Sequence, residues 1–322
     1  MPDRSTSFSL SLLHPRYWLT WVLLGLSAVL AQLPFRLQMW MGRGLGRLLY
    51  HLMATRRYVA ERNIELCFPE YSIEQRNRLV KKHFEANGMT VFETGIAWFM
   101  PYWRLRKRFV VKGVDCWHAL QQSTTGNVGA KSSGKPQGAL IMAMHFNTLE
   151  ITNVAINRLF NMSMSYRPHN NPVYDFVQQY GRERHNGAST AIDRRDVRGM
   201  VKAMKRGDWL WYAADQDYGA KVSEFVPWFG IDAAMVSAPP RLAAMANVPM
   251  VGIAYRRLPD FSGYEIEFLP AFETIPSGDN SADLRVLNQH FERCIRANPE
   301  EYLWVHRRFK TRPPNKARLY SK

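Results

Sequence analysis

The chain has 322 residues, of which 46% are hydrophobic, and its 43 basic and 27 acidic residues give a formal net charge of +16. This length allows one large domain or two small ones. The charge indicates an anionic partner, such as nucleic acid, an anionic membrane, or an acidic protein or phosphate ligand, and a basic solvated surface is the alternative. The cysteines Cys67, Cys116 and Cys294 form no CxxC pair, which argues against a zinc site and a disulfide framework.

An apolar segment near the N-terminus, residues 17–34, lies between Arg16 and Arg36. Its uncharged part, from Trp18 to Leu33, would span about 24 Å as a helix, compared with about 30 Å for the hydrocarbon core of a bilayer. We expect a membrane-anchoring helix, either a short tilted transmembrane helix or one inserted into a single leaflet. The alternatives are a buried helix and a cleaved signal peptide, although no A-x-A-like cleavage site follows the segment.

Residues 36–57 combine five arginines with large apolar side chains, a composition typical of a basic interfacial helix. Arginine is denser after the apolar segment than before it, which predicts that the rest of the chain lies in the cytoplasm. The stretch GRGLG at 42–46 lacks the GxGxxG spacing of a dinucleotide loop. We therefore expect an N-terminal anchor with its interfacial helix at 1–57 and a main domain at 58–322.

The first elements of the main domain are predicted from capping and composition. Ser72 and Gln75 have capping-box spacing, so a helix begins after Ser72. Residues 121–138 are rich in Ser, Thr, Gly and Lys, and we expect a flexible surface loop there. Apolar or alternating runs then predict five strands, the last two forming a hairpin: 138–144, 162–168, 209–214, 249–257 and 263–270.

Helical patterns separate and follow these strands. One apolar helical face begins at Ile151, and a second helix occupies 194–207, with Asp193 as its N-cap and Gly207 as its C-terminal stop. A last long helix is expected at 281–297. Strands alternating with helices predict an α/β fold, here a mixed sheet flanked by helices, with a membrane-anchoring helix at its N-terminus.

His145 and Glu150 are the residues most suggestive of chemistry. His145 directly follows the strand predicted at 138–144, and five helical positions would leave the two side chains about 140° apart. They can meet if His145 lies in the turn and Glu150 one turn into the helix. Glu150 would then accept from the imidazole Nδ1–H and leave Nε2 free as the general base for a substrate hydroxyl. A capping histidine followed by an ordinary helical glutamate is the alternative.

Several sequence blocks, including His-x4-Glu, resemble the bacterial late acyltransferases of lipid A, a branch of the glycerolipid-type acyltransferases. The blocks are HPRYWLTW (14–21), RNIELCFPE (62–70), ETGIAWF (93–99), HFNTLE (145–150), YRPHNNP (166–172), DQDYG (215–219) and EYLWVHRRFKTRP (301–313). The resemblance implies that 58–322 is an acyltransferase domain with His145 and Glu150 as catalytic residues. It also implies transfer of a fatty acyl chain from an acyl-carrier-protein thioester to a hydroxyacyl chain of Kdo2-lipid IVA, without metal or cofactor. The wider superfamily has Asp where Glu150 stands.

Four further residues are expected to bind substrate. Arg167 ends a strand, where α/β sheets place their ligands, and its guanidinium suits phosphate; a solvated arginine is the alternative. The resemblance implies a basic active-site residue near 182–184, for which we prefer Arg182 to Arg184. Asp215 and Asp217 follow the third strand, and we expect them to stabilise a turn or bind a substrate hydroxyl rather than a metal.

The expected partners are an acyl carrier protein, a phosphorylated lipid A precursor and a membrane, but not nucleic acid. An acidic carrier and a phosphorylated lipid both suit the net charge of +16. The expected location is the bacterial inner membrane, single-pass or monotopic, with the active site facing the cytoplasm. Two alternatives remain open: an acyltransferase for a glycerol-phosphate lipid, and a non-enzymatic basic protein that binds membrane or nucleic acid.

Overall fold

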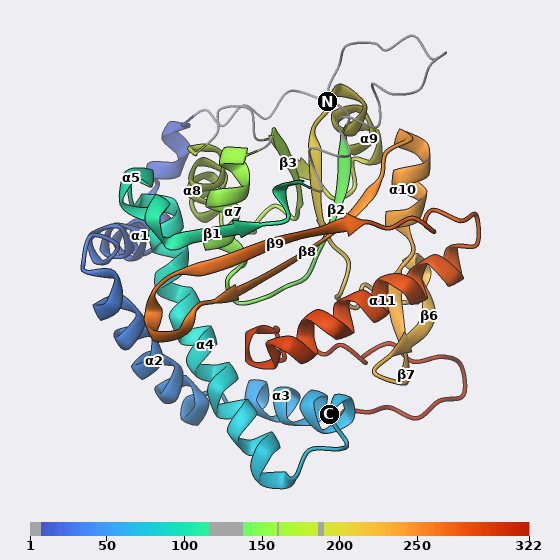
Figure 1. The fold of residues 1–322 in the computed structure, drawn as a ribbon. Helices are drawn as coiled ribbons and strands as arrows, with labels where there is room; N and C mark the ends of the chain where they lie inside the picture. The colour runs from blue at the N-terminus through green and yellow to red at the C-terminus, as the bar shows by residue number, and fades with distance from the viewer. Residues whose placement is uncertain (1–7, 116–137, 160, 186–189, 322) are drawn as a thin grey trace.

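A seven-stranded sheet forms the centre of the computed structural model, which describes residues 8–115, 138–159, 161–185 and 190–321. The loop expected at 121–138 lies outside the described residues except for Gly138. All neighbouring strands are parallel except β8 and β9, which form the expected antiparallel hairpin, so the sheet is mixed as predicted (Figure 1). In spatial order the strands are β1 (Phe109–Lys112), β9 (Tyr264–Ala271), β8 (Met250–Arg257), β2 (Ala139–Ala143), β5 (Trp209–Ala213), β3 (Met162–Tyr166) and β4 (Thr190–Asp193).

The order of the connections explains which helices cover each face of the sheet. From β2 the chain passes through α7 (Leu149–Leu159) to β3 and through α8 (Pro172–Glu183) to β4, then returns through α9 (Val197–Arg206) to β5. Crossovers between parallel strands are right-handed. When the chain reverses its direction across the sheet, the connecting helix therefore lies on the opposite face. Accordingly, α7 and α8 pack against α4 (Ile73–Phe99), whereas α9 packs against α10 (Ala238–Ala246).

Local signals place most element boundaries. Ser72 and Gln75 form the expected capping box at the start of α4, and Gly207 ends α9 at a φ of 105°. The cap predicted at Asp193 is wrong, because Asp193 ends the unpredicted strand β4. The N-cap is Asp196, which accepts a hydrogen bond from the Gly199 N–H at 2.9 Å. A small antiparallel sheet was also not predicted, formed by β6 (Ser223–Trp228) and β7 (Ile231–Val236).

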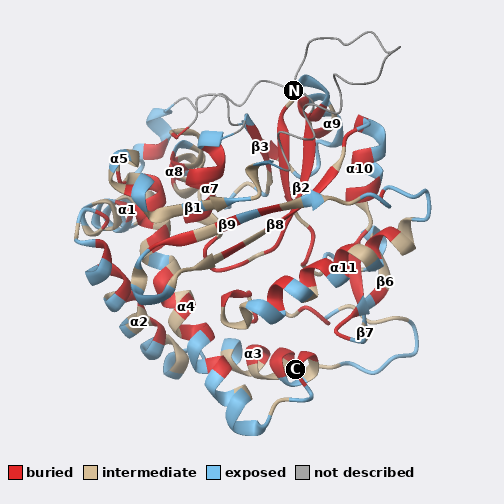
Figure 2. Ribbon diagram, in the orientation of Figure 1, coloured by how far each residue is buried: buried red, intermediate tan, exposed pale blue. Residues whose placement is uncertain are grey.

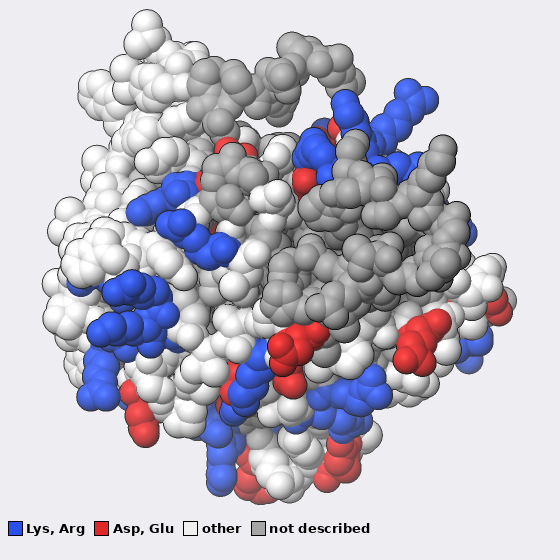
Figure 3. Space-filling view, turned by 45° about the horizontal axis from the view of Figure 1, so that its top comes forward, with Lys and Arg blue, Asp and Glu red and all other residues white. Residues whose placement is uncertain are grey.

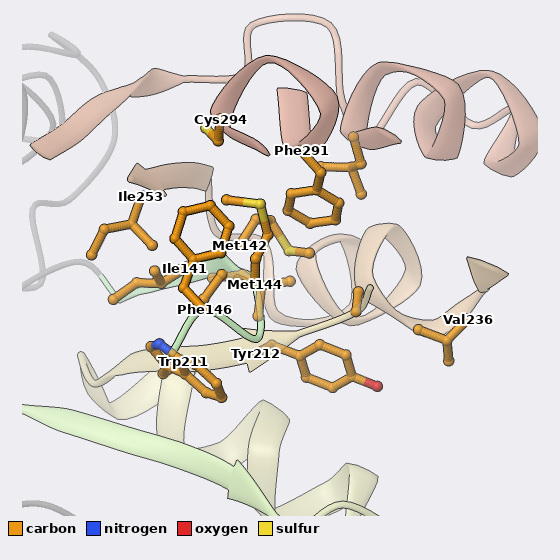
Figure 4. Packing of buried hydrophobic residues seen from close by; sticks show 14 of the residues in the cluster. Ile141, Met142, Met144, Phe146, Trp211, Tyr212, Val236, Ile253, Phe291 and Cys294 are labelled. Atoms are coloured by element: carbon orange, nitrogen blue, oxygen red, sulfur yellow. The ribbon is translucent and has the colours of Figure 1, made fainter. Parts of the chain in front are cut away.

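The hydrophobic core surrounds the central strands β2 and β5. All five residues of β2 and the first four of β5 are buried, as expected for parallel strands covered on both faces (Figure 2). Figure 4 shows Met142 and Phe146 near Phe291, which comes from the last helix, α11 (Asn280–Ala297). This packing holds the carboxyl ends of β2 and β5 in place.

Three helices precede α4: α1 (Trp18–Leu30), α2 (Phe35–Leu52) and α3 (Ala54–Cys67). Gly42 and Gly46 of α2 lie against Gly88 of α4, so GRGLG is a helix-packing motif. A Cβ added at Gly42 would lie 2.6 Å from Met89 Cα, and one at Gly46 would lie 2.6 Å from Glu85 Cα. Among the described residues, no helix is both long and apolar enough to cross a membrane.

Replacing Gly46 by alanine tests this close packing. The added methyl would meet the α4 backbone, and overpacking of this kind typically costs about 1–3 kcal/mol. The matched control is Gly44→Ala in the same helix, because a Cβ at Gly44 meets nothing within 4 Å. We expect Gly46→Ala to lower the thermal unfolding midpoint and Gly44→Ala to leave it unchanged or raise it slightly. Equal midpoints for both variants would contradict the packing.

Candidate active site

The register of β2 and β5 brings His145 next to Asp215. Ala143 pairs with Ala213 at the carboxyl ends of the two strands, and His145 and Asp215 each follow two residues later. The His145 Nδ1 lies 2.7 Å from the Asp215 Oδ1, and the His145 backbone N–H donates to Oδ2 at 3.1 Å. Asp215 therefore holds both the backbone and the ring of His145.

The surroundings of Asp215 determine the state of the ring. Its side chain is fully buried, and burial would raise the carboxyl pKa, but the nearby His145 and its hydrogen bonds outweigh burial and lower that pKa. A carboxylate can only accept, so Nδ1 carries the hydrogen, and in the neutral form of the ring Nε2 is the nitrogen with the lone pair. The His145 side chain is 25% exposed and lines a cavity. The arrangement can remove a proton from a hydroxyl bound there.

The expected partnership of His145 and Glu150 is wrong. Glu150 instead accepts hydrogen bonds from Arg182, with Nε at 3.2 Å and a closer contact from Nη2, and from the Trp98 Nε1–H at 3.2 Å. Glu150 lies in the first turn of α7, which directs its carboxylate toward α4 and α8, while Asp215 occupies Nδ1. The turn between His145 and α7 therefore does not bring the two side chains together, and they remain apart, as five positions on a regular helix would place them.

Arg182 and Arg184 point to different places. Arg182 lines the cavity and is 15% exposed in its side chain. Burial would lower its pKa, but the paired Glu150 outweighs burial and raises it. Arg184 instead donates to the backbone carbonyls of Trp98 and Met100. The Glu150–Arg182 pair thus joins α7 to α8 as a largely neutralised ion pair in the cavity wall.

The cavity has a volume of about 680 Å³ and lies over the carboxyl ends of β2, β3 and β5. Aromatic and aliphatic side chains, including Trp211, Tyr212 and Val236, form part of its lining, and Figure 4 shows Tyr212 extending from β5 in the direction of Val236. Polar and charged side chains form the rest. A mixed lining of this kind suits a ligand that has both an apolar chain and an anionic group.

Three exposed arginines lie on the cavity wall, and one of them, Arg195, pairs with Asp193. Arg167 follows β3, as expected, and it forms no ion pair with any residue that the structure describes. Arg194 follows the unpredicted strand β4 and stacks over the Tyr218 ring at 5.1 Å. Arg194 and Trp98 were missed by the sequence analysis as site residues. The only signal for Trp98 was its place in the ETGIAWF block.

Asp217 stabilises a turn, one of the two roles expected for it. It is absent from the described residues that line the cavity, and its carboxylate accepts from the Gly219 N–H at 2.9 Å and the Thr311 N–H at 2.6 Å. Burial lowers the pKa of His306 to about 4, so its neutral Nε2 accepts from the Asp217 N–H at 3.2 Å. Substrate binding by Asp217 is therefore not supported by this geometry.

A second ion-pair network, which is buried, is connected to the loop that carries His145. Arg257 of β8 binds Glu93 of α4 at 2.6 Å and Glu301 at 2.6 Å, and the Tyr264 hydroxyl donates to Glu93 at 2.7 Å. The Glu301 carbonyl accepts from the Asn147 N–H at 2.7 Å, two residues beyond His145. The network thereby ties the loop that carries His145 to α4 and to the β8–β9 hairpin.

A double-mutant cycle tests the pairing of Glu150 with Arg182. We expect Glu150→Gln and Arg182→Gln each to lower the free energy of unfolding by about 2 kcal/mol, because each leaves a poorly solvated charge without its partner. The double variant should lose less than the sum by at least about 1 kcal/mol. Strict additivity, measured by denaturant unfolding, would show that the two side chains do not act as a pair.

Comparison with known proteins identifies the family. The family model for bacterial lipid A biosynthesis acyltransferase matches residues 5–311. The chain is similar to the lipid A biosynthesis lauroyltransferase of Escherichia coli, at 40% identity over 95% of this chain and 96% of that protein. It is also similar to the palmitoleoyltransferase of the same organism, at 38% identity over 97% and 98%, and to its myristoyltransferase, at 24% over 98% and 94%. The chain therefore belongs to the bacterial lipid A biosynthesis acyltransferases and is an acyltransferase, not a non-enzymatic binding protein.

Proposed function

We propose that this acyltransferase moves a fatty acyl chain from an acyl-carrier-protein thioester to the hydroxyl of a hydroxyacyl chain on Kdo2-lipid IVA. The observation that carries the proposal is the geometry of His145, whose Nδ1 is held by a buried carboxylate while the ring lines a cavity. The relatives support a fatty acyl donor, because their names specify lauroyl, palmitoleoyl and myristoyl transfer.

In the proposed reaction, His145 acts as the general base. Its Nε2 takes the proton of the acceptor hydroxyl while the hydroxyl oxygen attacks the thioester carbonyl carbon. The tetrahedral intermediate collapses by breaking the carbon–sulfur bond. The new ester remains on the lipid, and the thiolate of the carrier takes the proton back from the imidazolium. Asp215 keeps the ring in the required tautomer and stabilises the imidazolium that forms.

The arginines of the cavity divide into two that pair with an acid, Arg182 and Arg195, and two that do not, Arg167 and Arg194. Arg182 is neutralised by Glu150, so it chiefly shapes the wall between α7 and α8. Arg167 and Arg194 keep their charge and are exposed, so we assign them to anionic groups of the phosphorylated acceptor. Glu150 accordingly positions Arg182, in place of the role as partner of His145 that the sequence suggested.

The base assignment is tested by two substitutions. His145→Ala should lower kcat by about 10²–10⁴-fold, the usual cost of losing a general base. Asp215→Asn should lower kcat by at least ~10-fold, because a neutral amide does not stabilise the imidazolium as a carboxylate does. Turnover is measured with an acyl-carrier-protein thioester as donor and Kdo2-lipid IVA as acceptor, with the product identified by mass spectrometry.

Asp217→Asn is the matched control, because it makes the same change two residues away, outside the cavity lining of the described residues. We expect it to retain kcat in the folded fraction. A wild-type kcat for Asp215→Asn would contradict the assignment of His145 and Asp215 as a catalytic pair. Acylation of a glycerol-phosphate lipid by the wild-type enzyme, with Kdo2-lipid IVA left unchanged, would overturn the proposed acceptor.

Membrane attachment is part of the proposal, and it rests on the exposed face of α1. Leu24 is buried, and Ser27 lies against Gly95 of α4, whereas the opposite face exposes large apolar side chains. Because one side of α1 packs on protein, we propose that the helix lies in the plane of the membrane and inserts into one leaflet. The exposed apolar residues of α1 are Trp18, Leu19, Val22, Leu23, Leu26 and Val29.

Neighbouring elements extend this membrane face and connect it to the site. The segment after α5 (Tyr102–Leu105) exposes Arg106 and Lys107 beside the exposed Trp103, a combination that suits anionic lipid. The Thr20 hydroxyl of α1 accepts from Asn171, the N-cap of α8, at 2.8 Å. Since α8 carries Arg182, a lipid acceptor would reach the cavity from the side of α1 and α8. We assign this face to the cytoplasmic side of the bacterial inner membrane.

Vesicle binding tests the membrane face. Leu19→Ser with Val22→Ser should lower the partition of the protein onto anionic vesicles at least about 10-fold, because each exposed side chain would otherwise bury its apolar surface in lipid. The matched control is Ile73→Ser with Met245→Ser, two apolar residues on α4 and α10 that are 71% and 55% exposed. Equal partition of the two variants would contradict an α1 face in contact with lipid.

A further inference from the structure

The outer surface of α9 carries a line of basic side chains. Arg198, Lys202 and Lys205 follow one another at i, i+4 and i+7, so they lie within about 60° of each other around the helix axis. All three are exposed, whereas Met200, Ala203 and Met204 bury the other side of α9. Figure 3 shows Lys and Arg side chains gathered at the end of the molecule where α9 lies.

This α9 stripe, Arg198, Lys202 and Lys205, has no acidic partner in the part of the chain that the structure describes. The nearby acids are already engaged: Asp193 pairs with Arg195, Asp196 caps α9, and Asp208 pairs with Arg206. Like charges at i and i+4 repel one another in an isolated helix. The helix dipole favours Lys205 near the C-terminus, but it does not favour Arg198 in the first turn. The stripe is therefore complementary to an external acidic surface.

The surroundings of the stripe distinguish a protein partner from a membrane. The basic residues near α1 lie among many exposed apolar side chains, including Trp18, Leu19 and Trp103. On α9 the only exposed large hydrophobic residue is Val197, at 40%. Insertion into lipid needs apolar side chains, whereas an acidic protein surface needs only the charges. The composition of the stripe thus favours an acidic protein.

The position of α9 connects the stripe to the reaction. Arg194 and Arg195, which directly precede α9, line the cavity that contains His145. The α9 helix lies on the face of the sheet opposite α7 and α8, and Figure 1 shows α8 and α1 on one side of the molecule and α9 and α10 on the other. A partner on α9 would reach the cavity without displacing a lipid held beside α1 and α8.

We propose that Arg198, Lys202 and Lys205 form the docking surface for the acidic carrier protein that delivers the acyl thioester. This assignment rests on the proposed function and adds the site at which the donor protein binds. The carrier presents acidic side chains to the stripe, and its thioester-bearing arm passes Arg194 and Arg195 to reach His145. Donor and acceptor then approach the cavity from different sides.

Charge reversal tests the docking surface with two donors that carry the same acyl chain, one on the carrier protein and one on pantetheine alone. Arg198→Glu with Lys202→Glu and Lys205→Glu should raise KM for the carrier-protein donor at least about 10-fold and leave kcat nearly unchanged. The same variant should use acyl-pantetheine like the wild type. Added salt should raise the wild-type KM for the carrier-protein donor, because exposed charges are screened.

The matched control is Arg78→Glu with Lys81→Glu and Lys82→Glu on α4, where three exposed basic residues undergo the same change in charge. We expect this variant to keep the wild-type KM for both donors. Equal effects of the two triple variants, or an equal effect on both donors, would overturn the docking surface. So would loss of binding to anionic vesicles by the α9 variant with unchanged donor kinetics. Failure of the proposed function is a separate result, in which the wild type transfers acyl chains from neither donor.

Discussion

The hydrogen-bonded pair of His145 and Asp215 depends on a buried carboxylate at the ends of two adjacent strands. A buried charge is costly unless it is paired and hydrogen-bonded, and Asp215 meets this condition by accepting from both the backbone and the ring of His145. The contacts that satisfy the carboxylate therefore also fix the orientation of the imidazole. Backbone contacts reinforce the arrangement, since the His145 carbonyl accepts from the Leu303 N–H at 3.0 Å. The stability of the buried carboxylate and the positioning of the imidazole thus have the same physical origin.

The distribution of charge follows from the same requirement. Inside the molecule the cations are hydrogen-bonded: Arg182 pairs with Glu150, and Arg257 pairs with Glu93 and Glu301. The buried Arg308 donates to the Ala234 carbonyl at 2.7 Å. The basic excess of the chain is left on the surface, where unpaired charge is tolerated. Parts of it lie at the cavity mouth, beside the exposed face of α1 and along α9. These locations match the phosphorylated acceptor, the membrane and the carrier protein in the reaction that we propose.

The N-terminal helices are packed into the enzyme by small residues. Gly42 and Gly46 bring α2 against Gly88 of α4, while Thr20 and Asn171 join α1 to α8. The proposed membrane face is consequently part of the same packed structure as the wall of the cavity. Attachment to a membrane would hold the cavity at a defined orientation to the lipid surface, with the α1 and α8 side toward the acceptor.

Local patterns in the sequence were sufficient to predict much of this protein. Apolar runs predicted β2, β3, β5 and the hairpin, and the capping box predicted the start of α4, because these signals act over a few residues. His145 and the four substrate-binding candidates were also named, from their positions after strands and from the family resemblance. The strand β4 and the cap at Asp196 were missed because β4 is short and only partly buried, so it shows no clear alternation.

The partners of the site residues were decided by the tertiary structure alone. Sequence spacing paired His145 with Glu150, its nearest acid along the following helix, but the sheet places Asp215 beside it, 70 residues away. That neighbour follows from β5 lying next to β2 in register, and strand adjacency cannot be read from either strand separately. Likewise Glu150 meets Arg182 only because α7 and α8 pack on the same face. The sequence by itself determined the elements and the chemical groups, whereas hydrogen bonds between distant residues required the packed sheet.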